Sequence, residues 1–242
     1  MKQERRVFMV ASGKGGVGKS TVSTALALQL CKEHKTLLID CDVYLPSLDI
    51  LSGMTGEAIF SWLDVLNGIC TPEQALLHHR YALLSAPNIG SEIPPDSIEK
   101  LLAFYPEYDA VIIDCAAGLG FSLELASKAA DTALIVCTAD EASIRSAAAA
   151  AKKIDKLGVP KSFLIINRYD PKGAVKGRLL GIDDMVDRTE TPLLGIIPYI
   201  GSLLRSDGND ISLCVPLTDT AIRIAMRLYN LPIPLELQNA VR

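Results

Sequence analysis

The sequence predicts an α/β fold, in which helices cover both faces of a twisted, mostly parallel sheet of about seven or eight strands. Short apolar runs of strand length recur along the 242 residues, with helical patterns between them. Hydrophobic residues make up 49% of the chain and aromatic residues 5%, which suits a sheet of aliphatic side chains buried on both faces. No linker, repeat or low-complexity tract divides residues 1–242, so we expect one domain.

The turn between the first strand and the first helix has the pattern of a phosphate-binding loop. After the apolar run 7–10, Gly13 and then Gly18-Lys19-Ser20 satisfy GxxxxGK[ST], the Walker A motif. Glycines let backbone N–H groups point at phosphate oxygens, and the N-terminus of the helix adds a positive dipole end. We expect Lys19 to reach the β- and γ-phosphates and the Ser20 hydroxyl to ligate Mg²⁺. The predicted nucleotide-binding residues here are Gly13, Gly15, Gly16, Val17, Gly18, Lys19, Ser20 and Thr21.

Two other interpretations of the turn stay open at this point. Gly13, Gly15 and Gly18 also fit GxGxxG, the dinucleotide fingerprint, and Asp40 follows where a ribose-binding acid would stand. That pattern does not account for a lysine and a serine in the first helical turn. The turn could also be a plain glycine connection between a core strand and a core helix.

Lys14 is a second lysine inside the loop. Its charge would lie close to that of Lys19 unless an anion lay between the two or Lys14 pointed away from its own site. Residues 14–21, KGGVGKST, resemble the deviant Walker A motif of the MinD/ParA family of ATPases. In that family the first lysine crosses a dimer interface to the partner's ATP. The resemblance therefore implies an ATP-dependent homodimer with Lys14 and Lys19 as catalytic residues.

Residues 36–40 form the predicted second strand, which ends at Asp40 and Asp42. Ligands of open α/β sheets bind at the carboxyl ends of strands, and a carboxylate near the γ-phosphate can hold a water in line for attack. This segment resembles switch I of MinD-type ATPases, which implies that Asp42 orients that water and that Asp40 helps to hold the magnesium shell. Both acids could instead be turn or capping residues. Ser47 departs from the asparagine usual in MinD.

Helical periodicity and turn residues organise the next part of the chain. The first helix is expected to end near His34, and residues 57–77 have a helical pattern with one break. Residues 81–85 form the predicted third strand. A further helix, capped at residues 93–97, is expected to end near Phe104.

Residues 110–114 form a buried apolar strand that ends in Asp114. Many parallel strands end in aspartate, but combined with the phosphate loop this is a Walker B pattern, in which Asp114 holds Mg²⁺ through water. The following residues 115–120, CAAGLG, resemble switch II of the same family. Gly118 could supply flexibility there and a backbone N–H for the γ-phosphate.

Two features of the last third bear on the nucleotide base. Asn167-Arg168, after the strand 163–167, resembles the family's N-R pair, whose asparagine recognises adenine; a carboxamide can donate to and accept from the adenine edge. Without the resemblance, Asn167 could be a simple turn residue. Pro198 ends the strand 193–198, which resembles the family's G-x-I-P motif beside the base. Other expected elements are a strand at 133–137, helices at 138–157 and 217–229, and a polar loop at 170–178.

The composition limits the classes of function. The net charge of −4 does not indicate DNA binding. We see no signal-peptide core and no run long and apolar enough to span a membrane, and the six cysteines include no C-x-x-C pair, so we expect a cytoplasmic protein without an iron–sulfur site. Residues 231–236 contain two prolines and cannot form the basic amphipathic tail helix by which typical MinD proteins dock on membranes, so stable membrane binding is not expected.

The resemblance covers nearly the whole chain and implies a P-loop NTPase fold. The predicted function is a Mg-ATP-dependent dimerising switch that hydrolyses ATP to control spatial positioning or the release of an unidentified protein partner. A dinucleotide-dependent oxidoreductase and a non-hydrolysing interaction module are the alternatives. The predicted cofactors are ATP and Mg²⁺. The predicted magnesium-binding residues are Ser20, Asp42 and Asp114, and the predicted nucleotide contacts outside the loop are Gly118, Asn167, Arg168 and Pro198.

Overall fold

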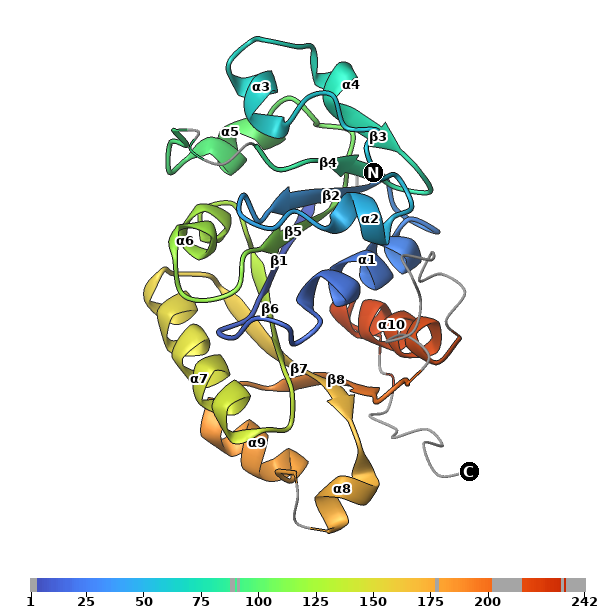
Figure 1. Cartoon of the computed structure of the whole chain (residues 1–242), viewed down its shortest axis with the longest axis vertical. Coiled ribbons are helices and arrows are strands. Elements are labelled where there is room, and N and C mark those ends of the chain that lie inside the picture. The colour runs from blue at the N-terminus through green and yellow to red at the C-terminus, as the bar shows by residue number, and fades with distance from the viewer. Residues whose placement is uncertain are drawn as a thin grey trace.

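The computed structural model describes residues 4–87, 90, 92–176, 179–201, 215–231 and 233. Across these residues, eight strands form one sheet in the order β3-β4-β2-β5-β1-β6-β7-β8, with helices on both faces (Figure 1). All neighbouring strands are parallel except β3, which is antiparallel to β4. The predicted fold class is confirmed. The strands are β1 (Arg6–Ala11), β2 (Thr36–Cys41), β3 (Leu76–His78), β4 (Ala82–Leu84), β5 (Ala110–Cys115), β6 (Thr132–Cys137), β7 (Lys161–Tyr169) and β8 (Leu193–Pro198).

Two apolar layers enclose the sheet because side chains of each strand point alternately to its two faces. In β1, Phe8 and Val10 pack toward α1 and α10, whereas Val7 and Met9 pack toward the layer of α3, α5, α6, α7 and α9. The described helices are α1 (Lys19–Leu30), α2 (Leu48–Leu51), α3 (Trp62–Leu66), α4 (Pro72–Ala75), α5 (Ser97–Leu102), α6 (Phe121–Ser127), α7 (Glu141–Lys156), α8 (Pro171–Val175), α9 (Ile182–Thr189) and α10 (Val215–Leu228).

The central strand β1 lies at the point where the order of strands reverses, with β5 on one side and β6 on the other. In an open α/β sheet, ligands bind in the crevice beyond the carboxyl ends of the strands at such a point. The register places Val10 beside Asp114, and Asp114 beside Asp40. The acids that end β2 and β5 therefore lie next to the turn that follows β1.

Some predicted elements were wrong. Residues 57–77 do not form an interrupted helix: only α3 and α4 are helical, and Leu76–His78 is the edge strand β3. Gly56 and Gly68 have positive φ angles that end helical geometry on either side of α3. The first helix ends at Leu30 rather than near His34.

The predicted polar loop at 170–178 contains the short helix α8, which Asp170 caps by accepting a hydrogen bond from the Lys172 N–H at 3.0 Å. Helices α6 and α9 were not predicted. Most of the tail segment 231–236 lies outside the described residues, so its predicted lack of a helix stays a prediction. Within the described part of the chain, no helix is long and apolar enough to cross a membrane.

Candidate nucleotide site

The turn between β1 and α1 is held by glycine geometry and by close packing. Gly16 and Gly18 have φ angles of 75° and 90°, in the left-handed region that favours glycine. A Cβ atom at Gly18 would overlap the side-chain amide of Asn167, and one at Gly13 would overlap the backbone of Ser146 in α7. The loop therefore lies directly against the end of β7 and against α7, and larger residues do not fit at these two positions.

A cavity of about 360 Å³ opens over this turn. Its volume lies within the range of small-molecule sites. Of the predicted residues, Gly13, Lys14, Asp114, Gly118, Asn167 and Pro198 lie outside its lining. The residues that line it include eight of the phosphate loop and its flanks, from Ser12 and Gly15 through Thr21, together with Asp42, Leu45, Ser47, Ile50, Leu51, Ala117 and Arg168.

Lys19 and Ser20 converge on one buried carboxylate at the bottom of this site. The Lys19 amine lies 3.1 Å from Asp114, and the Ser20 hydroxyl donates to the other carboxylate oxygen at 2.6 Å. The Ser23 hydroxyl, one helical turn after Lys19, donates to Asp114 at 2.7 Å. Asp114 is 1% exposed, so three donors satisfy a carboxylate that would be costly to bury alone.

Asp40 is the neighbouring acid on β2 and is 2% exposed. Its oxygens accept hydrogen bonds from the backbone N–H groups of Asp42 at 2.9 Å, Ser47 at 3.2 Å and Leu48 at 3.3 Å. Burial, together with the charge of Asp114, raises the pKa of Asp40 to about 7. Asp40 thus holds the segment after β2 in place, and a positive charge placed between the two acids would favour its ionised form.

Asp42 lies at the wall of the cavity and is partly exposed. One of its carboxylate oxygens accepts from the backbone N–H groups of Tyr44 at 3.3 Å and Leu45 at 3.1 Å, which closes a turn. Asp42 is therefore a turn residue, as one of the two interpretations of the sequence predicted. Both of these hydrogen bonds involve Oδ1, so the second oxygen remains able to accept a hydrogen bond from a water or to approach a metal.

Lys14 does not point at the cavity. Its amine lies 3.1 Å from Asp140 of the α7 N-cap, and both side chains are a little under half exposed. Burial works against the ionised Asp140, but hydrogen bonds from Thr138, the Ser143 N–H and Lys14 outweigh it, so the pKa of Asp140 is lowered. The two lysines of the loop therefore have two different acids as partners.

Asn167 and Arg168 fasten the loop to the end of β7. The Asn167 side chain donates to the carbonyl of Val17 at 2.7 Å and accepts from the Arg168 N–H at 2.9 Å. The Arg168 guanidinium donates to the carbonyl of Gly16 at 2.9 Å. These contacts use one N–H and one lone pair of the carboxamide, which leaves one of each for a base.

The residues that follow β5, 116–120, fold back onto the end of β1. The Gly118 N–H, which was predicted to face a γ-phosphate, donates to the carbonyl of Ser12 at 2.8 Å, and Gly118 has a φ of 98°. Pro198 ends β8 beside Tyr169 of β7, and two strands, β6 and β7, lie between β8 and β1. Neither residue lines the cavity, and their predicted nucleotide contacts stay predictions.

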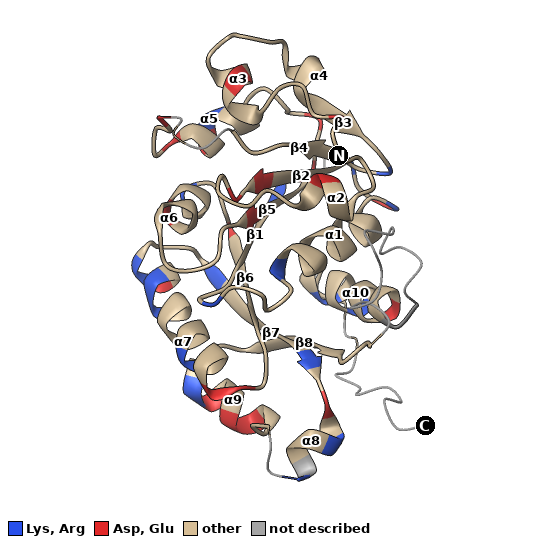
Figure 2. Cartoon of the chain, viewed as in Figure 1, with Lys and Arg blue, Asp and Glu red and all other residues tan. Residues whose placement is uncertain are grey.

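The charges of the site suit a magnesium ion and phosphate groups. Acidic positions end β2 and β5, and they face the basic start of α1 (Figure 2). Mg²⁺ prefers oxygen ligands and usually keeps several waters, binding through one or two carboxylates and substrate phosphates. The Ser20 hydroxyl and the Asp114 carboxylate, 2.6 Å apart, fit that donor set. Within the described residues, no group of three or more Cys, His, Asp and Glu side chains is arranged to hold a metal ion.

Four features of the site were not predicted: the contact of Ser23 with Asp114, the pairing of Lys14 with Asp140, the hydrogen bond of the Trp62 indole to the Asp40 carbonyl at 2.8 Å and the packing of Gly13 on α7. Only Ser23 carries a signal in the sequence, since it stands one helical turn after Lys19 and so on the same face of α1.

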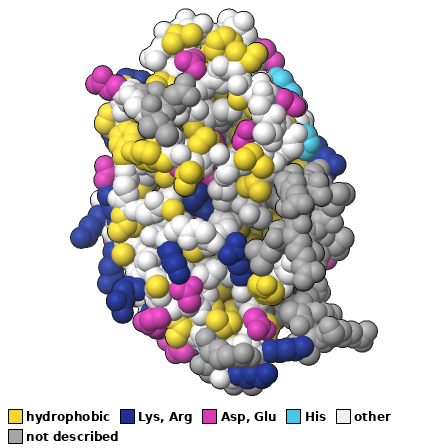
Figure 3. Space-filling view, in the orientation of Figure 1, with side chains coloured by type: hydrophobic (Ala, Val, Ile, Leu, Met, Phe, Trp, Pro, Cys, Tyr) yellow, Lys and Arg dark blue, Asp and Glu magenta, His cyan; other side chains and the backbone are white. Residues whose placement is uncertain are grey.

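Apolar side chains surround the site on the protein surface. Tyr44 and Leu45, after β2, are 68% and 77% exposed, and Leu119 and Phe121, after β5, are 38% and 42% exposed. Yellow side chains are visible in several places on the face shown in Figure 3. Exposed apolar side chains grouped around a site mark candidate interaction surfaces.

Comparison with known proteins gives a consistent result. Residues 8–213 match the CobQ/CobB/MinD/ParA nucleotide binding domain. The putative septum site-determining protein MinD of Emiliania huxleyi is 32% identical over 201 residues, which is 80% of this chain and 74% of that protein.

Solved structures agree. The MinC:MinD cell division protein complex of Aquifex aeolicus contains a chain with 30% identity and a TM-score of 0.87, covering 96% of this chain and 98% of that one. The septum site-determining protein MinD of Pyrococcus horikoshii, solved with Mg-ADP, has a TM-score of 0.80 over 93% of this chain and 96% of that one. At 22% identity this second likeness concerns the fold.

Proposed function

Because this chain belongs to the CobQ/CobB/MinD/ParA nucleotide-binding family and has MinD proteins among its relatives, we propose that it is a Mg-ATP-dependent dimerising switch that hydrolyses ATP to ADP and phosphate. The observation that carries the proposal is the cluster at the end of the glycine turn, where Lys19 and Ser20 both contact Asp114. A plain turn between a strand and a helix has no need of a buried acid held by a lysine and two serines.

The dinucleotide alternative is disfavoured by Asp40. A ribose-binding acid must present its oxygens to a ligand, but Asp40 is 2% exposed and accepts from three backbone N–H groups of its own chain. The lysine and serine in the first turn of α1 also have no role in that alternative.

In the proposed reaction the protein positions its substrate and neutralises charge. The N–H groups of the loop and the start of α1 hold the phosphates, and Lys19 exchanges Asp114 for a phosphate oxygen. Bound Mg²⁺ supplies further charge neutralisation, and Ser20 and Asp114 are the residues that would hold it, with Asp42 at its edge. Asp42 orients the attacking water by its second carboxylate oxygen.

Lys14 is proposed to serve the partner's ATP. It lies outside its own cavity and is paired with Asp140 at the surface, so it can leave that partner at little cost. The exposed apolar residues Tyr44, Leu45 and Phe121 flank the site and would be covered in a face-to-face dimer. A cation supplied in trans is worth roughly 10³–10⁵ in rate in other phosphoryl-transfer enzymes.

The adenine base is proposed to contact Asn167, whose carboxamide keeps one donor and one acceptor position free. Arg168 lines the cavity beside it. Pro198, at the end of β8, does not line the cavity. We propose no direct contact for it beyond a place in the loop near the base.

The cellular role proposed is spatial positioning in division or partition, in the cytoplasm and through an unidentified protein partner. The relatives named above are septum site-determining proteins, and one was solved in a MinC:MinD complex. A DNA-binding role is not proposed, because the net charge is −4. Stable membrane binding is likewise not proposed, because residues 231–236 carry two prolines.

The dimer is tested by Lys14→Ala, with Lys152→Ala on the exposed face of α7 as a matched control. We expect Lys14→Ala to bind ATP with wild-type affinity in calorimetry but to lose most ATP-dependent dimer in analytical ultracentrifugation and most phosphate release. Lys152→Ala should behave as wild type. If Lys14→Ala dimerises and hydrolyses ATP normally, the proposed role of Lys14 is wrong.

The hydrolytic step is tested by Asp42→Ala. This variant should bind ATP and accumulate as a dimer while releasing phosphate at least about a hundredfold more slowly, the scale of a lost positioning group. Undiminished turnover would refute the role of Asp42. A wild-type protein that binds ATP and dimerises but releases no phosphate would instead establish the non-hydrolysing module.

The cofactor is tested by titrating the wild-type protein with ATP and with NAD in the presence of Mg²⁺. Binding of ATP and no heat with NAD is the expected result. Binding of NAD without ATP would establish the dinucleotide alternative.

A further inference from the structure

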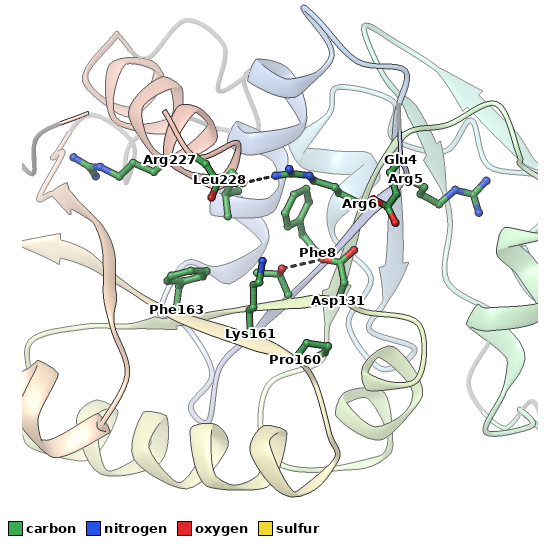
Figure 4. Close-up of a pocket in the computed structure, with 12 residues that line it drawn as sticks. Glu4, Arg5, Arg6, Phe8, Asp131, Pro160, Lys161, Phe163, Arg227 and Leu228 are labelled. Carbon is green, nitrogen blue, oxygen red and sulfur yellow. Dashed lines mark hydrogen bonds between the residues drawn. The ribbon is translucent and has the colours of Figure 1, made fainter. Parts of the chain in front are cut away.

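A second cavity, of about 540 Å³, lies at the opposite edge of the sheet from the phosphate loop. It opens where β1, β6 and β7 begin and α10 ends (Figure 4). The six residues of β1 separate it from the loop by roughly 17 Å at the usual rise of a strand. The volume suits a small organic molecule. The lining residues are Glu4, Arg5, Arg6, Phe8, Asp131, Thr132, Pro160, Lys161, Phe163, Arg227, Leu228 and Asn230.

Two cationic side chains of this cavity have donors to spare. Lys161, the first residue of β7, projects between Phe163 and Asp131 in Figure 4, and its amine makes no hydrogen bond or ion pair with any residue of the described chain. The Arg6 guanidinium donates one N–H to the Leu228 carbonyl at 2.6 Å and lies 4.5 Å above the Tyr229 ring. Among the described residues, its other four N–H donors have no hydrogen-bond acceptor.

The acids of the cavity are less available. Asp131 accepts from the backbone N–H of Val7 at 2.8 Å and from the Thr132 hydroxyl at 2.9 Å, so each of its oxygens already has a donor. Glu4 is exposed near the first strand. The open hydrogen-bonding positions inside the cavity are therefore mainly donors, and they would be satisfied by an anion.

The other two guanidinium groups are committed elsewhere. Arg5 donates to three carbonyls at the end of α5 and beyond, those of Leu102, Tyr105 and Tyr108. Arg227 donates to the carbonyl of Leu194 at 2.6 Å. Figure 4 draws both pointing away from Lys161. An anion in the cavity would thus meet Lys161 and Arg6.

The rest of the wall is apolar. Phe163 is partly buried and packs on the core, Phe8 is 2% exposed, and Pro160 and Leu228 also line the cavity. Aromatic and aliphatic walls with a few convergent polar groups are typical of sites for small organic ligands. A fully hydrated ion such as free phosphate would leave these walls uncovered.

We propose that this cavity binds a small amphipathic organic anion, whose acid group pairs with Lys161 and Arg6 and whose aromatic or aliphatic body lies against Phe163 and Leu228. The site is separate from the nucleotide site and does not depend on ATP hydrolysis. The cavity is lined by the start of β1, the start of β7 and the end of α10, so a bound anion would also hold these three segments together. From this cavity, β1 continues into the phosphate loop.

The test uses 2-naphthoate as the probe and its neutral analogue 2-naphthylmethanol as the comparison, in protein-observed NMR titrations. We expect naphthoate to shift backbone signals of residues 5–8, 131–132 and 161–163. The alcohol should bind at least about tenfold more weakly, as for the loss of a hydrogen bond to a charged group. Equal affinity of the two probes, or shifts confined to other residues, would overturn the proposal.

Lys161→Met, which keeps the aliphatic stem, should weaken naphthoate binding at least about tenfold, whereas the control Lys152→Met should not change it. Unchanged binding in Lys161→Met would overturn the assignment of the acid group. Excess Mg-ADP should leave naphthoate bound, and displacement would mean that the probe occupies the phosphate loop instead. The comparison of acid with alcohol uses wild-type protein, so it stands even if a variant folds poorly.

Discussion

Asp140→Asn should strengthen the ATP-dependent dimer. The carboxylate of Asp140 holds Lys14 at 3.1 Å, and that ion pair must break before Lys14 can reach a partner's site. Asparagine removes the charge but still accepts from the Ser143 N–H, now 3.0 Å away, so the N-cap of α7 is kept. The change therefore isolates the ion pair from the stability of the helix.

The size of the effect follows from the exposure of the pair. Its two side chains are 45% and 43% exposed, so solvent screens it, and pairs of this kind contribute about 0.2–1 kcal/mol. Two such pairs break when two protomers associate. The dimer dissociation constant should thus fall by a factor of up to roughly 30, which corresponds to about 2 kcal/mol.

The assay is sedimentation equilibrium with Mg²⁺ and a non-hydrolysable ATP analogue. Asp155→Asn, an equal loss of charge at an exposed position near the end of α7, is the control and should leave the dissociation constant unchanged. A dimer of Asp140→Asn that is equal to or weaker than wild type would refute the reasoning, since Asp140 would then not restrain Lys14.

Three further predictions concern the site. Gly18→Ala should lower the free energy of unfolding by at least about 1–2 kcal/mol in urea titrations and abolish ATP binding. Gly18 has a φ of 90°, and a Cβ atom there would overlap the side-chain amide of Asn167. The control is Gly53→Ala, at a φ of 71° in open space, which should lower stability but leave ATP binding unchanged. Burial and the charge of Asp114 raise the pKa of Asp40 to about 7, so the folded state binds a proton that the unfolded chain releases above its ordinary value of 3.8. The stability that Asp40 contributes is therefore fully present below pH 3.8 and is lost as the pH rises through about 7. In urea titrations without Mg²⁺, the free energy of unfolding should therefore fall by up to roughly 4 kcal/mol as the pH rises from about 4 to above 7. Asp40→Asn should remove this pH dependence, and an equal fall in that variant would contradict the assignment. Ser23→Ala removes a 2.7 Å donor to Asp114 and should weaken Mg²⁺-dependent ATP binding about tenfold in calorimetry, with no change in binding contradicting the role.

The parts of the site that could be predicted are contiguous in sequence or end a strand. Residues 13–21 carry the whole phosphate loop, and Asp40, Asp42 and Asp114 end or follow apolar runs that were predicted as strands of a mostly parallel sheet. The structure shows that these two strands are neighbours. Local sequence patterns are enough to predict this loop because its own consecutive backbone N–H groups bind the phosphates. The helix and the strands around it were predicted for the same reason.

What was missed depends on contacts between distant segments. Asp140 lies 126 residues from Lys14, and nothing local marks it as a partner. Residues 76–78 follow a helical pattern but extend the sheet beside β4, since pairing with an existing strand outweighs weak helical propensity. Asn167 was predicted to contact the adenine base. Its hydrogen bond to the Val17 carbonyl depends on the position of the end of β7 beside the loop, which the sequence does not show.

The central claim is that one turn carries two lysines that serve two different triphosphates. It is tested most directly by mixing Lys14→Ala with Asp42→Ala, each of which should be nearly inactive alone. In a mixed dimer, the Lys14→Ala protomer keeps its own Asp42 and receives a lysine from its partner, so one of the two sites is complete. Phosphate release should recover to up to about a quarter of the wild-type rate, given random pairing in a two-fold dimer. If Lys14 acts on its own nucleotide instead, no site in any pairing is complete, and the mixture will stay as inactive as its components.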